Sequence, residues 1–229
     1  MIIGRGMVAT AFAPVWQDDR RVCILAAGVS NSREVDPAQF EREEVLVRSV
    51  MAADVGRIVY FGSCAVGNPN ETESPYLIHK RRMESLVIGD PRGRVLRLPQ
   101  VVGRGGNSGT LTDFLSARIA SGEYFEVWKN AERNLIDVDD VCALATHVIR
   151  SDERYPRVVS LADSVSTPML SIVQAMEESV GRVGNYGLLD KGAPFIIDTS
   201  DCSRAAAEIG IGFDGNYYKR VIAKYYSIF

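Results

Sequence analysis

The chain opens with Met1-Ile2-Ile3-Gly4-Arg5-Gly6-Met7-Val8-Ala9, which joins a short apolar run to a glycine-rich turn. Residues 4, 6 and 9 form the pattern G-x-G-x-x-A, and Met7 to Trp16 predicts an amphipathic helix. Strand, turn and helix in this order are the setting that a dinucleotide-binding fingerprint requires. Gly4 permits the tight turn, Gly6 lets backbone approach a pyrophosphate, and the helix start offers free N–H groups. An ordinary strand-to-helix turn is the alternative interpretation.

Strands and helices alternate along the rest of the chain. Apolar runs predict strands at Val22 to Gly28, Arg57 to Ser63, Arg94 to Leu98 and Val158 to Leu161. Periodic segments predict helices at 37–51, 76–88, 111–121, 137–150, 168–180 and 216–229. In the helix at 37–51, Phe40, Val45, Leu46 and Val50 are expected on one side. Near-continuous apolar strands between helices predict an α/β fold with a parallel sheet covered on both faces.

Composition and charge are those of a soluble globular protein. The chain has 229 residues, of which 46% are hydrophobic and 24% charged, and its net charge of −3 gives no electrostatic footprint for nucleic acid. No apolar stretch reaches the ~20 residues of a membrane span, and Met1 begins a strand instead of a signal peptide. Four scattered cysteines and only two histidines predict reduced thiols and no metal site. We therefore expect a cytoplasmic protein.

Tyr76 and Lys80 lie four residues apart in the run Ser74-Pro75-Tyr76-Leu77-Ile78-His79-Lys80. On a helix this spacing puts both side chains on one face, one turn apart. A nearby ammonium favours phenolate, so we expect Lys80 to lower the pKa of Tyr76 from about 10 towards working pH. Such a phenol can exchange a proton with an alcohol while hydride moves at the carbon. The pair also occurs by chance on many helices, and we interpret His79 as an ordinary helix residue.

The order of these motifs resembles the extended short-chain dehydrogenase/reductase family, in its NAD-dependent sugar-nucleotide epimerase/dehydratase branch. The resemblance runs from the glycine turn to about residue 215. Its landmarks are Gly4, the strand end Ala26-Ala27-Gly28, Ser63, the Tyr76 and Lys80 pair, the segment Arg97 to Gly103, and the segment Asn134 to Val141.

The resemblance implies a fold and a set of site residues. The fold would be a Rossmann-like doubly wound parallel sheet, abbreviated in its first half, with a core in residues 1–150 and a small C-terminal substrate lobe in 151–229. The implied catalytic residues are Ser63, Tyr76 and Lys80. The implied residues for NAD or NADP are Gly4, Gly6, Met7, Ala26, Ala27, Gly28, Tyr76, Lys80, Pro99 and Val102. The implied substrate-binding residues are Ser63, Asn107 and Arg133, for a nucleotide sugar; a surface loop and a solvated arginine are the alternatives for the last two.

The first half of the chain departs from the family pattern. A dinucleotide fold normally carries an acid that holds the adenine ribose about 20 residues after the glycine turn. Here that position falls in Val22 to Gly28, which ends in Ala26-Ala27-Gly28 without an acid. The run is either the second strand without its acid or, as the resemblance implies, the fourth strand with the second and third absent. Arg20 and Arg21 could meet a 2′-phosphate or form a solvated turn.

Several functions remain compatible with these residues. An NAD(P)-dependent oxidoreductase or epimerase acting on a nucleotide-activated sugar fits the Ser63, Tyr76 and Lys80 set. Cys64 and Ala65 follow Ser63 in place of an acidic residue, which argues against dehydration, while reductase and epimerase stay equally open. The abbreviated first half favours a non-catalytic regulatory protein that binds a dinucleotide or a sugar nucleotide. The aromatic C-terminus predicts a core-facing stripe or an interface, and the family resemblance allows a homodimer.

Overall fold

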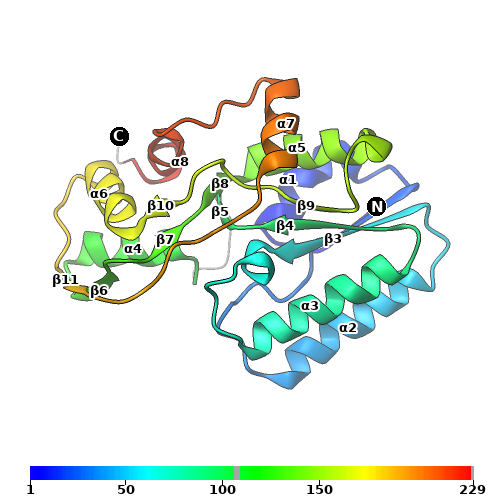
Figure 1. The fold of residues 1–229 in the computed structure, drawn as a ribbon, viewed down its shortest axis with the longest axis horizontal. Coiled ribbons are helices and arrows are strands. Elements are labelled where there is room, and N and C mark those ends of the chain that lie inside the picture. The colour runs from blue at the N-terminus through cyan, green and yellow to red at the C-terminus, as the bar shows by residue number, and fades with distance from the viewer. Residues whose placement is uncertain (106–108, 228–229) are drawn as a thin grey trace.

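A five-stranded parallel sheet forms the centre of the molecule, and helices cover both of its faces (Figure 1). The computed structural model describes residues 1–105 and 109–227. The strands follow the order β1 (Ile2–Ile3), β2 (Val22–Leu25), β3 (Arg57–Ser63), β4 (Gly93–Leu98) and β9 (Val158–Ser160). The predicted Rossmann-like parallel sheet is thereby confirmed.

Two helical layers enclose the sheet. One face carries α1 (Met7–Trp16), α5 (Val138–Arg150) and α7 (Ser200–Ile209), and the other carries α2 (Pro37–Met51) and α3 (Pro75–Gly89). Successive side chains of a strand point to opposite faces. Ile24, Val59 and Leu96 accordingly pack with the α1 and α5 layer, whereas Ile58 and Val95 pack with the α2 and α3 layer.

The first two crossovers of the sheet have opposite hands. Both β1 to β2 and β2 to β3 connect neighbouring parallel strands in the same direction across the sheet. Their helices cover opposite faces, because α1 packs against α5 and α2 packs against α3. Since about 98% of such crossovers are right-handed and α3 repeats the arrangement of α2, we assign the left hand to β1–α1–β2.

The unusual hand follows from the abbreviated first half of the fold. A full dinucleotide fold places its second and third strands beyond the free edge of strand 1. Within residues 1–105 and 109–227, no strand pairs with that edge of β1. Without these two strands, α1 still covers the face of the sheet that it covers in a full fold. The chain then continues from α1 into β2, which pairs with the opposite edge of β1. The structure thus favours the interpretation that Val22–Leu25 corresponds to a fourth strand and not to a second strand that lost its acid.

The remaining elements form a smaller region beside the sheet. Three strand pairs build it: β5 (Gln100–Val102) with β8 (Leu135–Asp137), β6 (Phe125–Trp128) with β11 (Tyr186–Leu189), and β7 (Glu132–Arg133) with β10 (Thr167–Pro168). Its helices are α4 (Leu111–Ser121), α6 (Met169–Val180) and α8 (Tyr217–Tyr226). The short 3-10 turns lie with the main sheet instead: η1 (Cys64–Gly67) contacts β3 and α3, and η2 (Asp152–Arg154) contacts α5. Segments from before and after residue 150 therefore combine in this region, while β9 and α7 join the main sheet.

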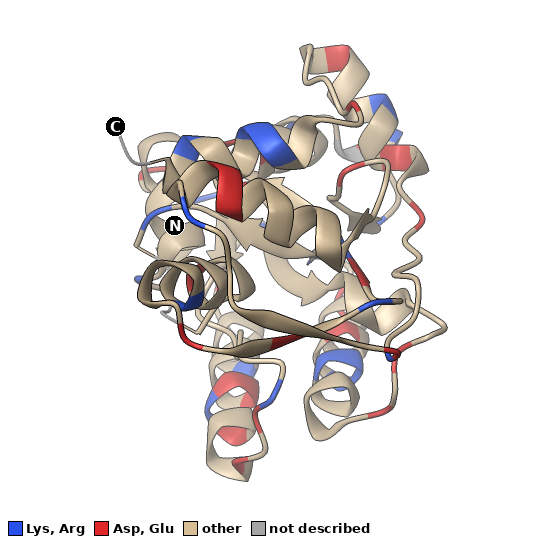
Figure 2. Cartoon of the chain, turned by 90° about the vertical axis from the view of Figure 1, so that its left-hand side faces the viewer, with Lys and Arg blue, Asp and Glu red and all other residues tan. Residues whose placement is uncertain are grey.

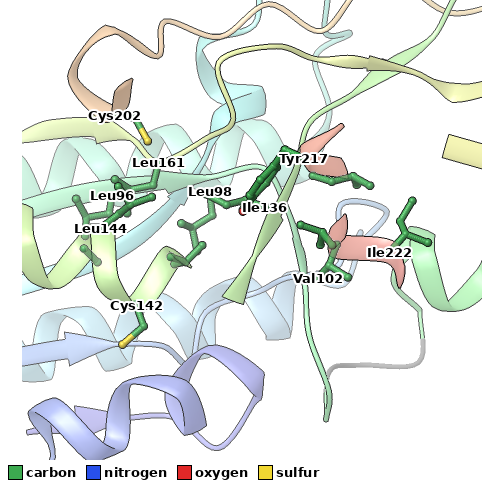
Figure 3. Close-up of a cluster of buried hydrophobic side chains, with 14 of the residues drawn as sticks. Leu96, Leu98, Val102, Ile136, Cys142, Leu144, Leu161, Cys202, Tyr217 and Ile222 are labelled. Atoms are coloured by element: carbon green, nitrogen blue, oxygen red, sulfur yellow. The ribbon is translucent and has the colours of Figure 1, made fainter. Parts of the chain in front are cut away.

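Helix α8 closes the larger hydrophobic core. Figure 3 shows Tyr217 and Ile222 of this helix in one cluster with Leu96, Leu98 and Ile136. The Tyr217 hydroxyl accepts from the Asp137 backbone N–H (3.1 Å) and donates to Asp140 (2.6 Å). Lys224 and Tyr225 each donate to Asp137 at 2.7 Å. Of the two interpretations of the aromatic C-terminus, the core-facing stripe is confirmed for the described residues.

Figure 2 shows acidic and basic residues interspersed along the helices. Every helix of the described ranges is too short or too polar to cross a bilayer. Among the described residues, no three His, Cys, Asp or Glu side chains gather into a group that could hold a metal ion. All four cysteines are buried and free.

Candidate active site

The predicted site residues gather at the carboxyl ends of the central strands, which is where ligands bind in open α/β sheets. Gly4 follows β1, Ala26 follows β2, Ser63 ends β3 and Pro99 follows β4. At the first of these ends, Gly4 has φ +142°, and a β-carbon there would lie 2.3 Å from the Ala26 carbonyl oxygen. The glycine is therefore required by a close approach of two backbones.

The start of α1 is open to an anion. Gly6 is its N-cap, without a capping side chain, and the first turn holds no acidic residue. Apart from Gly6 itself and its chain neighbours, no heavy atom of the described residues lies within 4 Å of where a Gly6 β-carbon would be. The unsatisfied N–H groups and the positive end of the helix dipole point into this space. Met7 begins the helix, with its sulfur against Gly103 at the end of β5.

Gly28 covers a buried pair of charges. A β-carbon at residue 28 would lie 2.4 Å from Glu43 Oε1 and 3.0 Å from Lys80 Nζ. The Lys80 ammonium donates to Glu43 Oε1 (3.0 Å) and to the Tyr60 hydroxyl (2.9 Å), and its side chain is 4% exposed. Glycine at residue 28 therefore lets the backbone lie directly against the carboxylate and the ammonium.

Glu43 is saturated with hydrogen-bond donors. Its Oε2 accepts from the Val29 N–H (2.7 Å) and faces His79 Nε2 (3.0 Å), while its Oε1 accepts from Tyr60 (2.7 Å) as well as Lys80. Burial opposes ionisation, but the hydrogen bonds and the Lys80 charge outweigh it and lower the pKa of Glu43 to about 2. The carboxylate is therefore charged at every working pH.

Tyr76 is a protonated phenol in this arrangement. Burial raises its pKa to about 12, the hydrogen bond with Ser63 opposes the rise, and the Glu43 and Glu84 carboxylates add to it. Lys80 Nζ lies 5.9 Å from the centre of the Tyr76 ring. The sequence-based expectation that the pKa of Tyr76 is lowered is wrong, because burial is the largest effect on this phenol and raises its pKa. Ser63 lies close enough to Tyr76 to lower its pKa against the effect of burial.

A second ion pair, between Arg97 and Glu84, lies near Tyr76. Arg97 donates to Glu84 through Nε (3.1 Å) and Nη2 (2.7 Å), an arrangement that holds both groups firmly. Pro99 is half-buried next in sequence to β4, whereas the Val102 side chain is 1% exposed and belongs to the hydrophobic core. Of the two implied cofactor residues in this segment, Pro99 is therefore the one whose side chain is partly exposed.

The loop between Ser63 and α3 is tied to the smaller region. Asn70 donates to the Pro194 carbonyl (2.9 Å), and the Ile196 N–H donates to Asn68 (3.3 Å).

Arg133 lies in β7 near this loop, since Glu71 is the charge that acts on it. Burial lowers the pKa of Arg133, and its one hydrogen bond to the described residues goes to the Glu132 carbonyl (2.6 Å). Asn107 lies outside the described residues.

Sequence reasoning missed Glu43 and Tyr60. It placed Val45 on the buried side of α2, but Val45 is 60% exposed and the buried positions are Glu43, Val47 and Val50. The spacing i, i+4, i+7 of these three was the available signal, since it puts a carboxylate on the apolar stripe. His79 likewise proves to be buried, stacked on Phe40 with ring centres 4.7 Å apart.

The residues present fit part of a dinucleotide. The open helix start at Gly6 suits a pyrophosphate, and Gly28 with Lys80 suits a ribose that lies beside Tyr76 and Pro99. The free edge of β1 leaves the adenosine side without the two strands, and without the acid, that normally line it. The fit is therefore good at the pyrophosphate and nicotinamide side and incomplete at the adenosine side.

Solved structures of similar fold come from sugar-nucleotide enzymes. The UDP-glucuronic acid 4-epimerase of Bacillus cereus, in complex with UDP-glucuronic acid and NAD, has a TM-score of 0.71 at 13% identity, over 94% of this chain and 76% of that one. The GDP-mannoheptose C4 reductase of Campylobacter jejuni with NADP bound has a TM-score of 0.73 at 13% identity, over 97% and 96%. RMD of Pseudomonas aeruginosa with NADPH has a TM-score of 0.69 at 18% identity, over 96% and 85%.

Sequence comparison identifies the family of the chain. A search of the curated proteins found no match. The family model described as the NAD dependent epimerase/dehydratase family matches residues 21–162, which is more than half of the chain and begins after the glycine turn. The family resemblance seen in the motifs is thereby confirmed, and NAD is the cofactor in the family's name. The chain belongs to the NAD dependent epimerase/dehydratase family.

Proposed function

We propose that this protein is an NAD(P)-dependent oxidoreductase or epimerase that acts on a nucleotide-activated sugar through Ser63, Tyr76 and Lys80. The observation that supports it is the convergence of these residues. Ser63, at the carboxyl end of β3, lies close enough to Tyr76 to act on its pKa, and Lys80 lies under Gly28, which follows the neighbouring β2.

Each residue has a role that its surroundings allow. Tyr76 exchanges a proton with the sugar oxygen at the reacting carbon, and Ser63 donates a hydrogen bond to the same oxygen as its charge changes. Lys80 binds ribose hydroxyls through its ammonium. The bound nicotinamide cofactor supplies or accepts hydride. Gly4, Gly6 and the α1 start hold its pyrophosphate.

The substrate class comes from the relatives and from Arg133. The epimerase structure named above holds UDP-glucuronic acid, and the reductase is named for GDP-mannoheptose. Arg133 can offer its remaining N–H groups to a diphosphate, which its planar fork matches. Replacing Arg133 by Ala should weaken nucleotide-sugar binding by about 10- to 100-fold, the loss expected for a charge-assisted hydrogen bond. Arg118→Ala, which removes a surface ion pair with Glu123 and a contact with the Phe114 ring, is the control.

The first experiment is a calorimetric titration with NAD⁺, NADH, NADP⁺ and NADPH. Micromolar binding of one pair would support the proposal and select the cofactor for assays with nucleotide-bound keto and hydroxy sugars. Absence of binding at millimolar concentration would contradict it.

A regulatory protein of the same fold is the second candidate. The observation that favours it is the free edge of β1, because the adenosine half of the usual site is missing from the described residues. Such a protein would bind a dinucleotide or a nucleotide sugar without turnover. Binding without conversion of any nucleotide sugar, together with unchanged affinity in Tyr76→Phe, would favour this candidate.

A homodimer is part of the proposal. Helices α2 and α3 pack side by side, and they expose Val45 (60%) and Ile78 (54%) on the face away from the sheet. Pairing of this face in two copies would bury both side chains. Light scattering on wild type and on Val45→Lys tests it, since a dimer should dissociate in the variant and a monomer should show no change.

A further inference from the structure

The buried carboxylate of Glu43 has no role in the function proposed so far. It comes from α2, which carries none of the Ser63, Tyr76 and Lys80 set, and its side chain is 1% exposed. Leaving a charge in the interior costs several kcal/mol unless it is paired and hydrogen-bonded. Here four donors meet its two oxygens, so the arrangement is complete.

The same carboxylate decides where the Lys80 ammonium lies. Two of the three ammonium protons go to Glu43 Oε1 and to the Tyr60 hydroxyl, and Tyr60 in turn donates to Glu43 Oε1. These three groups form a closed triangle of hydrogen bonds under Gly28. The third ammonium proton has no partner among the described residues.

We propose that Glu43 is a positioning residue of the active site: its carboxylate fixes the Lys80 ammonium under Gly28 and offsets its charge, so that Tyr76 meets the substrate as a neutral phenol, ready to protonate the oxygen of a keto sugar. This inference rests on the proposed function and sharpens it. It favours reduction of a nucleotide-bound keto sugar over a reaction that begins with removal of a hydroxyl proton.

The charged groups that face Tyr76 support a neutral phenol. Helix α2 supplies Glu43, helix α3 supplies Lys80 and Glu84, and η1 supplies the neutral Cys64 thiol, whose pKa burial raises. Glu84 is matched by Arg97 of β4, and Glu43 is matched by Lys80. Both cations therefore have a carboxylate of their own. No net positive charge remains beside the phenol to stabilise its anion.

The reduction balances with these groups. The keto carbon gains hydride, with two electrons, from the reduced nicotinamide cofactor, and the carbonyl oxygen gains the hydroxyl proton of Tyr76. The product is the sugar alcohol, and Tyr76 is left as phenolate. A proton from solvent restores the phenol before the next turnover. Ser63 donates its hydrogen bond to the same oxygen throughout.

The test is a titration of Tyr76 that requires no turnover. The protein is labelled with ¹³Cζ-tyrosine, and the resonance lost in Tyr76→Phe identifies this residue in NMR spectra taken against pH. In wild type we expect Tyr76 to stay protonated beyond about pH 10, the ordinary pKa of tyrosine. A wild-type pKa below about 9 would overturn the proposal without any variant at Glu43.

Three variants assign the effect to the carboxylate. Glu43→Gln keeps the shape and removes the charge, so the pKa of Tyr76 should fall by about 1 to 2 units. Glu43→Asp keeps the charge and should retain the wild-type value within about half a unit. Glu41→Gln makes the same chemical change on the exposed side of α2 and should have no effect. An unchanged Tyr76 pKa in a folded Glu43→Gln variant would refute the assignment.

Kinetics test the preferred direction separately. With reduced cofactor and a keto sugar, kcat should be level between about pH 6 and pH 9, whereas oxidation of the sugar alcohol should rise about tenfold per pH unit. Equal pH dependence in both directions would overturn the preference for reduction. If no dinucleotide binds but the Tyr76 titration shifts as expected, the Glu43 assignment is supported and the proposed enzymatic function fails.

Discussion

Gly4 faces the Ala26 carbonyl oxygen so closely that a β-carbon at residue 4 would lie 2.3 Å from it. This contact ties the turn after β1 to the end of β2, where the Ala26 N–H also donates to the Ile3 carbonyl at 2.8 Å. It joins two segments that both belong to the proposed cofactor site. The contact leaves no room for a side chain, in a backbone conformation that favours glycine.

Gly4→Ala should therefore lower the free energy of unfolding by about 1–3 kcal/mol, from the strained φ and the clash. Gly6→Ala is the matched control, because its β-carbon would meet no heavy atom of the described residues within 4 Å apart from its chain neighbours. It should fold like wild type but bind a dinucleotide more weakly, since the methyl group enters the space of the pyrophosphate. Urea unfolding and calorimetry measure the two effects. Equal stability of the two variants would contradict this account of the turn.

Tyr76→Phe should leave folding and cofactor affinity nearly unchanged and lower kcat by about 10²- to 10⁴-fold, the usual contribution of a general acid or base. The ring stays in place, and only the proton that moves is lost. Steady-state kinetics on the nucleotide sugar identified in the assays provides the measurement. The exposed Tyr124→Phe is the control. Full turnover in Tyr76→Phe would remove this residue from the mechanism.

Glu43 should make the protein sensitive to acid. Its pKa is lowered from 4.5 to about 2 in the folded state. A lowered carboxyl pKa gives stability that is complete above the unfolded pKa and is lost as the pH falls from about 4.5 towards 2. The contribution is about 3 kcal/mol.

The measurement is urea unfolding at a series of pH values for wild type and for Glu43→Gln. Wild type should lose stability more steeply below pH 4.5 than the variant does, because the variant has no proton to take up at this position. Glu41→Gln should follow the wild-type curve. Parallel curves for wild type and Glu43→Gln would show that the carboxylate is not held as described.

Helix α8 should be held in place by Tyr217. Tyr217→Phe removes the acceptor of the buried Asp137 N–H and the donor to Asp140, so unfolding should become easier by about 1–3 kcal/mol. Tyr218→Phe is the control, since its hydroxyl has no hydrogen-bond partner among the described residues and the ring stays packed. Thermal unfolding followed by circular dichroism compares them. The same melting temperature for both variants would contradict this role.

Local patterns predicted most of the architecture. The helices Met7–Trp16, Pro37–Met51 and Leu111–Ser121 and the strand Arg57–Ser63 have the predicted bounds. Short strands such as Thr167–Pro168 were missed, because two paired residues carry no periodicity of their own. On α2, Phe40, Leu46 and Val50 pack inward as predicted. Val45 was assigned wrongly to that side, because it looks more apolar than Glu43 until the partners of the glutamate are known.

The sequence by itself determined the alternation of strands and helices, the glycine turn and the shared helical face of Tyr76 and Lys80, since these depend on neighbours along the chain. Only the tertiary structure decided the hand of the first crossover and which charged groups lie beside Tyr76. Glu43 lies 37 residues from Lys80 in sequence but 3.0 Å away in space. Because the interaction of two charges depends on their distance and on how far water is excluded, spacing along the chain does not reveal which charge faces Tyr76.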